Sequence, residues 1–291
     1  MKIVLTGSLG HISKPLATKL VKDHDVTVIS SYKERQKEIE DVDASAAIGS
    51  LKDADFLTET FKGADAVYCM VPPNYFTEPN ILLFYRKIGS NYCEAIQRAG
   101  VERVVHLSSF GAHLDKDTGP VLGSHAIEHM LDKLPNILLT HMRPTSFYYN
   151  LNSFKEMIKA QGAIMANYGE DKVPMVSPKD IADAVAEELV KTADVQKYRY
   201  VSSDERTGQE IATVLGKAID RPDLKWKIIS DEEMQQGMIA SGMPEHIAMS
   251  LVDLYASIRT GKLAEEYERQ KPQKMGQVKL EDYAKEFAKD F

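Results

Sequence analysis

The sequence predicts an α/β protein with a doubly wound parallel sheet and a smaller, mostly helical C-terminal substrate domain. Three observations predict this fold. Apolar, strand-like runs alternate with helical patterns over the first half of the 291 residues. The first run leads straight into a glycine turn that opens a helix, and helices dominate from Thr207 onward. Near-continuous apolar strands separated by helices are typical of a parallel sheet covered on both faces.

We expect six strands and five helices in the first half. The strand-like runs are Ile3–Thr6, Val26–Ser30, Ala46–Gly49, Ala66–Val71, Val104–Ser109 and Ile137–Arg143. Helical patterns lie between them near residues 11–22, 33–40, 53–62, 80–99 and 120–134. Ligands of such sheets bind beyond the carboxyl ends of the strands, which is where the informative loops of this half fall.

The pattern loosens after Arg143. We expect a helix near 151–161, and a later helix with Ser177 as its N-cap and Pro178 at its first position. Strand-like segments lie at Val173–Val176 and Tyr198–Ser202. We assign residues 1–150 to the main domain, with 174–206 returning to it, and 151–173 and 207–291 to a substrate or capping region.

Composition and charge indicate an ordinary globular protein, with 43% hydrophobic and 27% charged residues. The formal net charge of −7 gives no attraction to nucleic acid or to an anionic membrane, so we expect neither partner. Cys69 and Cys93 lie in apolar stretches and suggest neither disulfides nor a metal cluster. Strand-like residues begin at Lys2 and no apolar run reaches membrane-spanning length, so we expect a cytoplasmic protein.

The segment from Lys2 to Ser13 carries the clearest functional signal. Four β-formers precede Gly7, which permits a tight turn, and Gly10, which lets the backbone approach a pyrophosphate. The third position of this motif, usually glycine or alanine, holds Ser13. The pattern predicts a dinucleotide-binding turn made by Gly7, Ser8, Leu9, Gly10, His11 and Ile12.

The end of the second strand favours NADP(H) over NAD(H). NAD-binding folds of this type place an acid there to hold the ribose hydroxyls, and this chain has none at the strand tip. The small and basic residues that suit a 2′-phosphate are Ser30, Ser31, Lys33 and Arg35. Glu34 weakens this interpretation, and the two cations can equally be solvated helix residues.

A second candidate cofactor segment follows the fourth strand. Val71 and Pro72 are followed by Pro73, and the two prolines remove amide donors and stiffen the chain. Such a segment can wall the central portion of the cofactor or form a simple rigid turn.

The chain resembles the NmrA-like family of atypical short-chain dehydrogenase/reductase proteins, which are related to sugar-nucleotide epimerases. The segments that carry the resemblance are Thr6–Ile12, His106–His113, Met142–Phe147 and Tyr200–Ser203. The resemblance covers nearly the whole chain and implies a Rossmann domain, bound NADP(H) and a small C-terminal substrate domain. It does not fix one activity, because the family includes quinone reductases, other reductases and redox-sensing regulators without turnover.

The short-chain reductase pair of a tyrosine and a lysine four residues later is absent at its expected place. With Glu128 as the family-like glutamate, the lysine position holds Ser124 and the tyrosine position holds Pro120. Two other matches occur, at Tyr168–Lys172 and Tyr267–Lys271. The first spans an expected loop and the second lies far from the expected helix, so we assign neither a catalytic role.

A zinc-peptidase pattern also occurs, because residues 125–129 read H-x-x-E-H. No third ligand with supporting context accompanies it, so we interpret these residues as ordinary helix residues near a cofactor and expect no metal. His125 lies next to the vacant lysine position and remains a candidate proton donor.

The resemblance places Ser108 and Ser109 beside the nicotinamide. Ser109 can hydrogen-bond a substrate carbonyl, or both serines can cap backbone groups at the strand end. The residues expected to flank the nicotinamide after the sixth strand are Pro144, Thr145 and Phe147. Tyr149 offers a hydroxyl donor nearby, or is structural.

These observations favour an NADPH-dependent reductase of a small apolar acceptor such as a quinone, which needs little acid catalysis. Methionines of the C-terminal region suit an adaptable apolar pocket, or belong to a core: Met234, Met238, Met243 and Met249. The alternative is a non-catalytic NADP(H) sensor that binds a protein partner. A sugar-nucleotide epimerase or dehydratase is disfavoured by the missing Tyr–Lys pair. The oligomeric state is not predicted.

Overall fold

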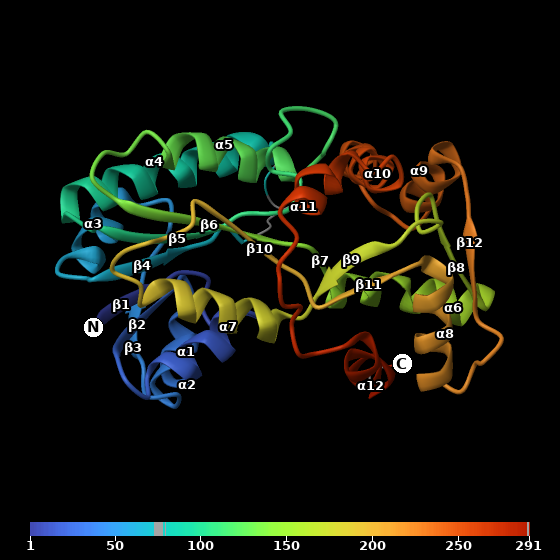
Figure 1. Ribbon diagram of the computed structural model, residues 1–291, viewed down its shortest axis with the longest axis horizontal. Coiled ribbons are helices and arrows are strands. Elements are labelled where there is room, and N and C mark those ends of the chain that lie inside the picture. The colour runs from blue at the N-terminus through green and yellow to red at the C-terminus, as the bar shows by residue number, and fades with distance from the viewer. Residues whose placement is uncertain (73–77, 79, 290) are drawn as a thin grey trace. The chain divides into compact units, whose positions relative to one another are not determined.

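The computed structural model describes residues 1–72, 78, 80–289 and 291, and the chain forms two compact units (Figure 1). Unit 1 comprises Met1–Ser109, Gly123–Arg143 and Ile181–Arg199, and unit 2 comprises Phe110–Leu122, Pro144–Asp180 and Tyr200–Phe291. The chain passes repeatedly from one unit to the other. No helix in the described part of the chain is long and apolar enough to cross a bilayer.

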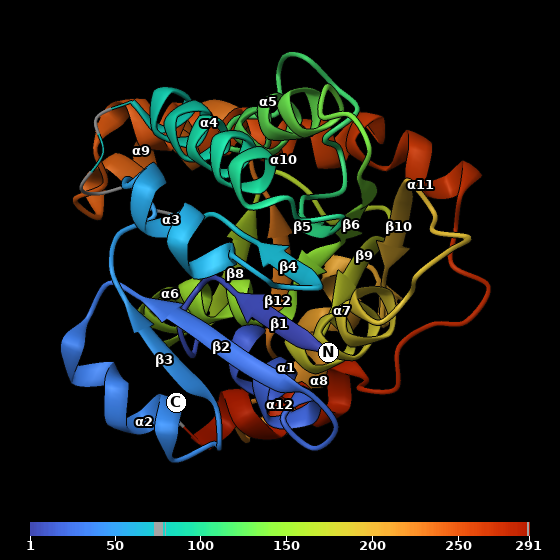
Figure 2. The same cartoon turned by 90° about the vertical axis from the view of Figure 1, so that its left-hand side faces the viewer.

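A seven-stranded sheet in the order β10-β6-β5-β4-β1-β2-β3 frames unit 1 (Figure 2). The strands are β1 (Lys2–Leu5), β2 (Asp25–Ser30), β3 (Ser45–Ile48), β4 (Ala66–Cys69), β5 (Arg103–Leu107), β6 (Leu138–Pro144) and β10 (Tyr198–Val201). The pairings from β3 through to β6 are parallel. The strand order reverses between β1 and β4, which is the switch point where doubly wound sheets bind their ligands. The predicted fold class is confirmed.

Helices cover both faces of this sheet. They are α1 (Ser13–Leu20), η1 (Lys33–Arg35), α2 (Gln36–Glu40), α3 (Ala54–Phe61), α4 (Ile81–Ala99), α5 (Val121–Leu131) and α7 (Pro178–Leu189). Figures 1 and 2 show α4 and α5 over one face and α1 and α7 over the other. Strand side chains alternate between these faces: Arg103 of β5 binds Glu188 of α7, whereas Ser108, just past the end of β5, binds Glu128 of α5.

The core of unit 1 forms where α3, α4 and α5 pack on the sheet. Fully buried members from strands and helices include Val4, Val67, Val104, Phe61, Tyr92 and Ile127. Burying one such side chain contributes about 1.5–3 kcal/mol. This core holds the carboxyl ends of β1, β4 and β5 at one edge of the sheet.

Unit 2 is mostly helical and contains two small sheets, ordered β11-β9-β7 and β12-β8. Its strands are β7 (Ser146–Phe147), β8 (Ala163–Ala166), β9 (Val173–Val176), β11 (Asp204–Arg206) and β12 (Lys225–Ile228). Its helices are η2 (Tyr148–Phe154), α6 (Lys155–Gln161), α8 (Gly208–Ala218), α9 (Asp231–Ala240), α10 (Glu245–Arg259), η3 (Lys262–Ala264), α11 (Glu265–Arg269) and α12 (Leu280–Lys289).

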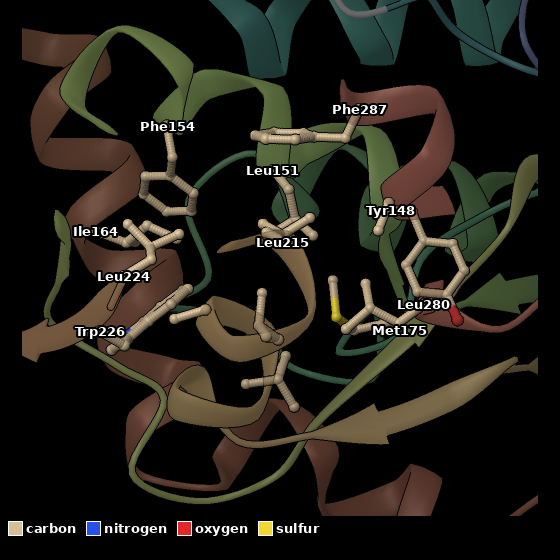
Figure 3. Packing of buried hydrophobic residues seen from close by; sticks show 14 of the residues in the cluster. Tyr148, Leu151, Phe154, Ile164, Met175, Leu215, Leu224, Trp226, Leu280 and Phe287 are labelled. Atoms are coloured by element: carbon tan, nitrogen blue, oxygen red, sulfur yellow. The ribbon is translucent and has the colours of Figure 1, made fainter. Parts of the chain in front are cut away.

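Figure 3 shows the apolar core of unit 2, in which Trp226 packs against Phe154. The two rings meet edge to face at 5.4 Å. The Trp226 indole N–H donates a 2.7 Å hydrogen bond to the carbonyl of Tyr168. Trp226 is therefore fixed by a hydrogen bond as well as by apolar packing.

The prediction and the structure differ locally at strand ends and at short strands. Strand β4 ends at Cys69 rather than Val71, because the Met70 N–H donates to the Thr6 hydroxyl at 2.8 Å and not to a neighbouring strand. Strand β5 ends at Leu107 rather than Ser109. Strands β7, β8, β11 and β12 are not predicted from the sequence.

The predicted start of α7 is confirmed. The helix begins at Pro178, and the Ser177 hydroxyl accepts a 3.2 Å hydrogen bond from the Lys179 N–H. The cap satisfies one of the helix's first N–H groups, and proline costs nothing at the first position because its missing N–H has no partner there.

Candidate functional site

The turn after β1 leaves little room for a side chain at two positions, Gly7 and Gly10. Gly7 has φ +91°, and a Cβ added there would lie 2.7 Å from the Met70 sulfur. A Cβ on Gly10 would lie 3.3 Å from the Gly7 carbonyl oxygen, to which the Gly10 N–H donates at the same distance. The Ser8 N–H donates to Ile29 of β2 at 3.0 Å. The turn is therefore closed on itself and tied to the neighbouring strand.

Helix α1 presents an open N-terminus behind this turn. Its N-cap, Ile12, makes no side-chain capping bond, and its first turn contains no acidic residue. Leu9 and Ile12 are buried and anchor the turn, while Gly10 and His11 are exposed. Helix N-termini carry partial positive charge on N–H groups that lack helical partners. This arrangement fits the pyrophosphate of a dinucleotide.

The end of β2 supports the turn through Ser30. Its hydroxyl is buried, and it accepts hydrogen bonds from the Ser8 hydroxyl at 3.1 Å and from the Tyr32 N–H at 3.2 Å. Ser31 is exposed beside it. The structure therefore brings Ser8 and Ser30 together, and gives Ser30 a role in holding the turn.

The two predicted cations, Lys33 and Arg35, are both exposed on η1. Arg35 Nη1 lies 2.7 Å from a Glu38 carboxylate oxygen, and Lys14 of α1 lies 3.3 Å from the other. The hydrogen bond from Arg35 lowers the pKa of Glu38, and the bond from Lys14 adds to this effect. The pairing of Arg35 and Lys14 with one carboxylate was not predicted from the sequence.

The segment after β4 lies against the glycine turn. The Met70 carbonyl accepts a 2.6 Å hydrogen bond from the Tyr92 hydroxyl, which fixes the start of the segment. Val71 is buried in the core of unit 1 and Pro72 is half-buried. Pro73 lies outside the described residues.

A buried ion pair holds Ser108 at the carboxyl end of β5. The Ser108 hydroxyl donates to Glu128 Oε1 at 2.5 Å. Arg143 contacts the same carboxylate twice, from Nε to Oε1 at 2.9 Å and from Nη2 to Oε2 at 2.6 Å. The Arg143 guanidinium also lies 3.9 Å from the centre of the Tyr198 ring. Arg143 is not predicted as a site residue from the sequence, and its signal there is a basic residue in a mostly apolar strand.

A second polar layer joins β5 and β6 to Asp132, the residue just past the end of α5. His106 Nδ1 and His141 Nδ1 are 3.0 Å apart, and His141 Nε2 lies 3.2 Å from Asp132. Lys197 binds the other oxygen of Asp132 at 2.9 Å. Burial, aided by His141, lowers the pKa of His106 well below its usual value. Burial alone would raise the pKa of Asp132, but hydrogen bonds from His141 and Lys197 lower it to about 2.

The zinc-peptidase pattern does not assemble a metal site. Glu128 is bound to Ser108 and Arg143, and His129 Nδ1 lies 3.0 Å from the His125 carbonyl oxygen. The ring centres of His125 and His129 lie 4.2 Å apart. Among the described residues, no group of three or more His, Cys, Asp or Glu could hold a metal ion. His125 and Ser109 are both half-buried.

The remaining candidates belong to unit 2. Pro144 ends β6 and is buried. The Thr145 hydroxyl oxygen lies 3.4 Å from the Val201 carbonyl oxygen and 3.3 Å from the Ser202 hydroxyl oxygen. The Phe147 and Tyr149 rings pack against each other at 5.1 Å.

The two Tyr-x-x-x-Lys matches, Tyr168–Lys172 and Tyr267–Lys271, lie in unit 2, and their tyrosines are buried there. Burial raises the pKa of both Tyr168 and Tyr267, the opposite of what an acid catalyst needs. The Tyr267 hydroxyl donates to Glu205 at 2.7 Å, and Lys271 binds that same carboxylate at 2.8 Å.

The four methionines differ in burial. Met234 is buried, Met238 and Met243 are half-buried, and Met249 is exposed.

The chain is similar in sequence and in fold to several known proteins. An NAD(P)H azoreductase from Xenophilus azovorans is 26% identical over 213 residues, which cover 72% of this chain and 70% of that protein. The NADPH-dependent quinone oxidoreductase QOR2 from Escherichia coli, solved with NADPH, matches with a TM-score of 0.84 and 17% identity over 98% of this chain and 99% of that chain. The Citrobacter triphenylmethane reductase, solved with NADP(H), matches with a TM-score of 0.82 and 20% identity over 98% and 99% of the two chains.

The two solved structures show a shared fold. The NmrA-like family matches residues 1–285, which is nearly the entire chain. The resemblance drawn from the glycine turn and the ends of β5 and β6 is thereby confirmed. The chain belongs to the NmrA-like family.

Proposed function

We propose that the protein is an NADPH-dependent reductase of a small apolar acceptor such as a quinone. The observation that carries the proposal is the tight turn at Gly7 and Gly10, followed by the uncapped N-terminus of α1, at the switch point of the sheet. The names of the similar proteins support it, since they are an azoreductase, a quinone oxidoreductase and a dye reductase that use or bind nicotinamide cofactors. When bound, the nicotinamide supplies a hydride.

NADP(H) is the proposed cofactor. Ser31 and Lys33 are exposed just beyond β2, and the strand tip carries no acid that would hold the ribose hydroxyls of NAD. Arg35 joins this group if a phosphate displaces Glu38 from it. The 2′-phosphate would then lie among cations supplied by η1 and α1.

The proposed class of acceptor, a quinone, follows from the absence of the Tyr–Lys pair at its expected positions in the sequence. Positions 120 and 124 hold proline and serine, so no tyrosine and lysine supply a proton as in other short-chain reductases. A quinone needs little acid catalysis, because conjugation stabilises the developing oxyanion. Binding and orientation of the two reactants then supply the rate enhancement. Ser109, half-buried just past the end of β5, is the proposed hydrogen-bond donor to the acceptor.

The test is the rate of NADPH oxidation at 340 nm with a panel of quinones, measured beside NADPH binding. We expect turnover well above the enzyme-free rate, lost in Gly10→Glu and retained in Gly237→Glu. Gly237 is the matched control, because it is exposed on α9 and an added Cβ meets nothing within 4 Å. Tight binding without turnover would instead favour the alternative, a non-catalytic NADP(H) sensor that binds a protein partner.

A further inference from the structure

Ser108 has a hydroxyl whose single hydrogen is already committed. A serine hydroxyl offers one donor and two acceptor lone pairs. The Ser108 hydrogen goes to Glu128 at 2.5 Å, and the glutamate faces a bidentate guanidinium from Arg143. A carboxylate is an acceptor only, so it cannot return a hydrogen to Ser108. The oxygen of Ser108 therefore retains only acceptor capacity toward any third group.

All three members of this network are buried, and Ser108 lies just past the carboxyl end of β5. Glu128 and Arg143 are each 2% exposed, and Ser108 is 5% exposed. The Ser108 N–H donates to the Met142 carbonyl at 2.8 Å, so the backbone of the serine is fixed to β6. Ser108 follows the last residue of β5, at the edge where a doubly wound sheet receives its ligands.

We propose that Glu128 and Arg143 are positioning residues that present Ser108 as a hydrogen-bond acceptor for the carboxamide N–H of the nicotinamide. The inference rests on the proposed function. A nicotinamide ring has one donor group, its carboxamide NH₂, whereas a quinone offers only acceptor oxygens. A hydrogen-bond acceptor at Ser108 therefore matches the nicotinamide and not the quinone. Ser108 is not a proton donor in the reaction.

The test compares the Kd of NADP⁺ with that of its 3-acetylpyridine analogue, in which a methyl group replaces the carboxamide NH₂. Isothermal titration calorimetry measures both constants without turnover. Loss of one hydrogen bond weakens binding about fivefold, so the wild-type protein should prefer NADP⁺ by about that factor. Ser108→Ala should bind both dinucleotides equally.

Glu128→Gln tests the positioning role. With its NH₂ at the position of Oε1, the glutamine gives up the contact with Arg143 Nε and donates to Ser108, which frees the serine hydrogen to point at the ligand and removes the preference for NADP⁺. The double variant Ser108→Ala and Glu128→Gln should show no further loss of preference, because both changes act on one contact.

Glu188→Gln is the matched control. Glu188 is a fully buried carboxylate on α7 that pairs with Arg103, at the opposite end of β5 and on the opposite face of the sheet. Its replacement also removes one buried charge from unit 1, so it should lower the melting temperature while leaving the preference for NADP⁺ unchanged.

Three results would count against the inference. A wild-type protein that binds both dinucleotides equally would overturn it and leave the proposed function standing. An unchanged preference in Ser108→Ala or in Glu128→Gln would also overturn it. A protein that binds neither dinucleotide would remove the proposed function as well.

Discussion

The Ser13 hydroxyl donates a 3.1 Å hydrogen bond to the carbonyl oxygen of Thr6. This contact joins the first residue of α1 to the residue after β1, across the glycine turn. The Ser13 oxygen also lies 3.1 Å from the position that a Cβ on Gly7 would take. The serine thus fits where the motif usually has glycine or alanine, and it ties helix and strand together.

Replacing Ser13 should change stability more than cofactor binding. Ser13→Ala removes a buried hydrogen bond, which typically costs about 1 kcal/mol of unfolding free energy. The hydroxyl bonds to the strand rather than pointing to the ligand, so the Kd for NADPH should stay within about twofold. Urea unfolding and calorimetry measure the two quantities. A large loss of affinity at unchanged stability would mean that the hydroxyl acts on the cofactor.

Stability should fall as the pH drops below the usual pKa of histidine. Burial lowers the pKa of His106 in the folded protein, so between about pH 6.5 and 5 the unfolded chain binds a proton that the folded chain does not. Stability rises with pH wherever the unfolded state holds more protons, so it is lost in this window on acidification. The slope from one such group is at most about 1.4 kcal/mol per pH unit.

His106→Asn isolates this contribution. The asparagine amide can still donate to His141, but it does not titrate. The variant should therefore show a shallower fall in melting temperature between pH 7 and 5. Asp132 does not confound the window, because its pKa of about 2 makes its stabilising contribution disappear only below about pH 4. An identical pH slope in variant and wild type would disprove the assignment to His106.

Unit 2 should be sensitive to any side chain at Gly208. A Cβ there would lie 2.5 Å from the Trp226 ring, which is held between Phe154 and Tyr168. Overpacking of this kind costs about 1–3 kcal/mol. Trp226 is the single tryptophan of the chain, so its fluorescence reports the unfolding of this unit directly.

Gly237→Ala is the control for Gly208→Ala, because an added Cβ there meets nothing within 4 Å. Its alanine should stabilise α9 by up to about 1 kcal/mol through helix propensity. If both variants unfold at the same urea concentration, the packing described around Trp226 is wrong.

Lys33 should set the preference between the two nicotinamide cofactors. Lys33→Ala removes an exposed cation beyond β2, and a charge-assisted hydrogen bond to the 2′-phosphate is worth about tenfold in affinity. The Kd for NADPH should rise by about that factor while the Kd for NADH stays constant. Lys37→Ala, on the neighbouring helix α2, is a control of equal charge. An equal rise in the Kd for NADPH and for NADH would argue against recognition of the 2′-phosphate by Lys33.

The sequence predicts the sheet and the glycine turn well, for a local reason. Gly7, Gly10 and the apolar positions of β1 and α1 act through backbone freedom and burial, which a short window contains. The parallel pairing of the strands follows from the alternation of strands and helices. The cap at Ser177 is equally local, and it is confirmed.

The polar networks are not predictable in the same way. Whether Glu128 meets Arg143, or Lys14 meets Glu38, depends on which faces of distant elements pack together. The strand β12 has the same difficulty, because only Trp226 of its four residues is buried and no apolar run marks it. Tertiary pairing decides these features, and no window of the sequence contains it.

The measurement that tests the central claim most directly is NADPH binding by calorimetry to three proteins: wild type, Gly10→Glu and Gly237→Glu. A glutamate side chain at position 10 crowds the Gly7 carbonyl oxygen. Its negative charge repels a pyrophosphate at the N-terminus of α1. We predict saturable one-site binding to the wild type and to Gly237→Glu, and none to a folded Gly10→Glu. Equal binding to all three, or binding to none, would contradict the assignment of the glycine turn as the cofactor site.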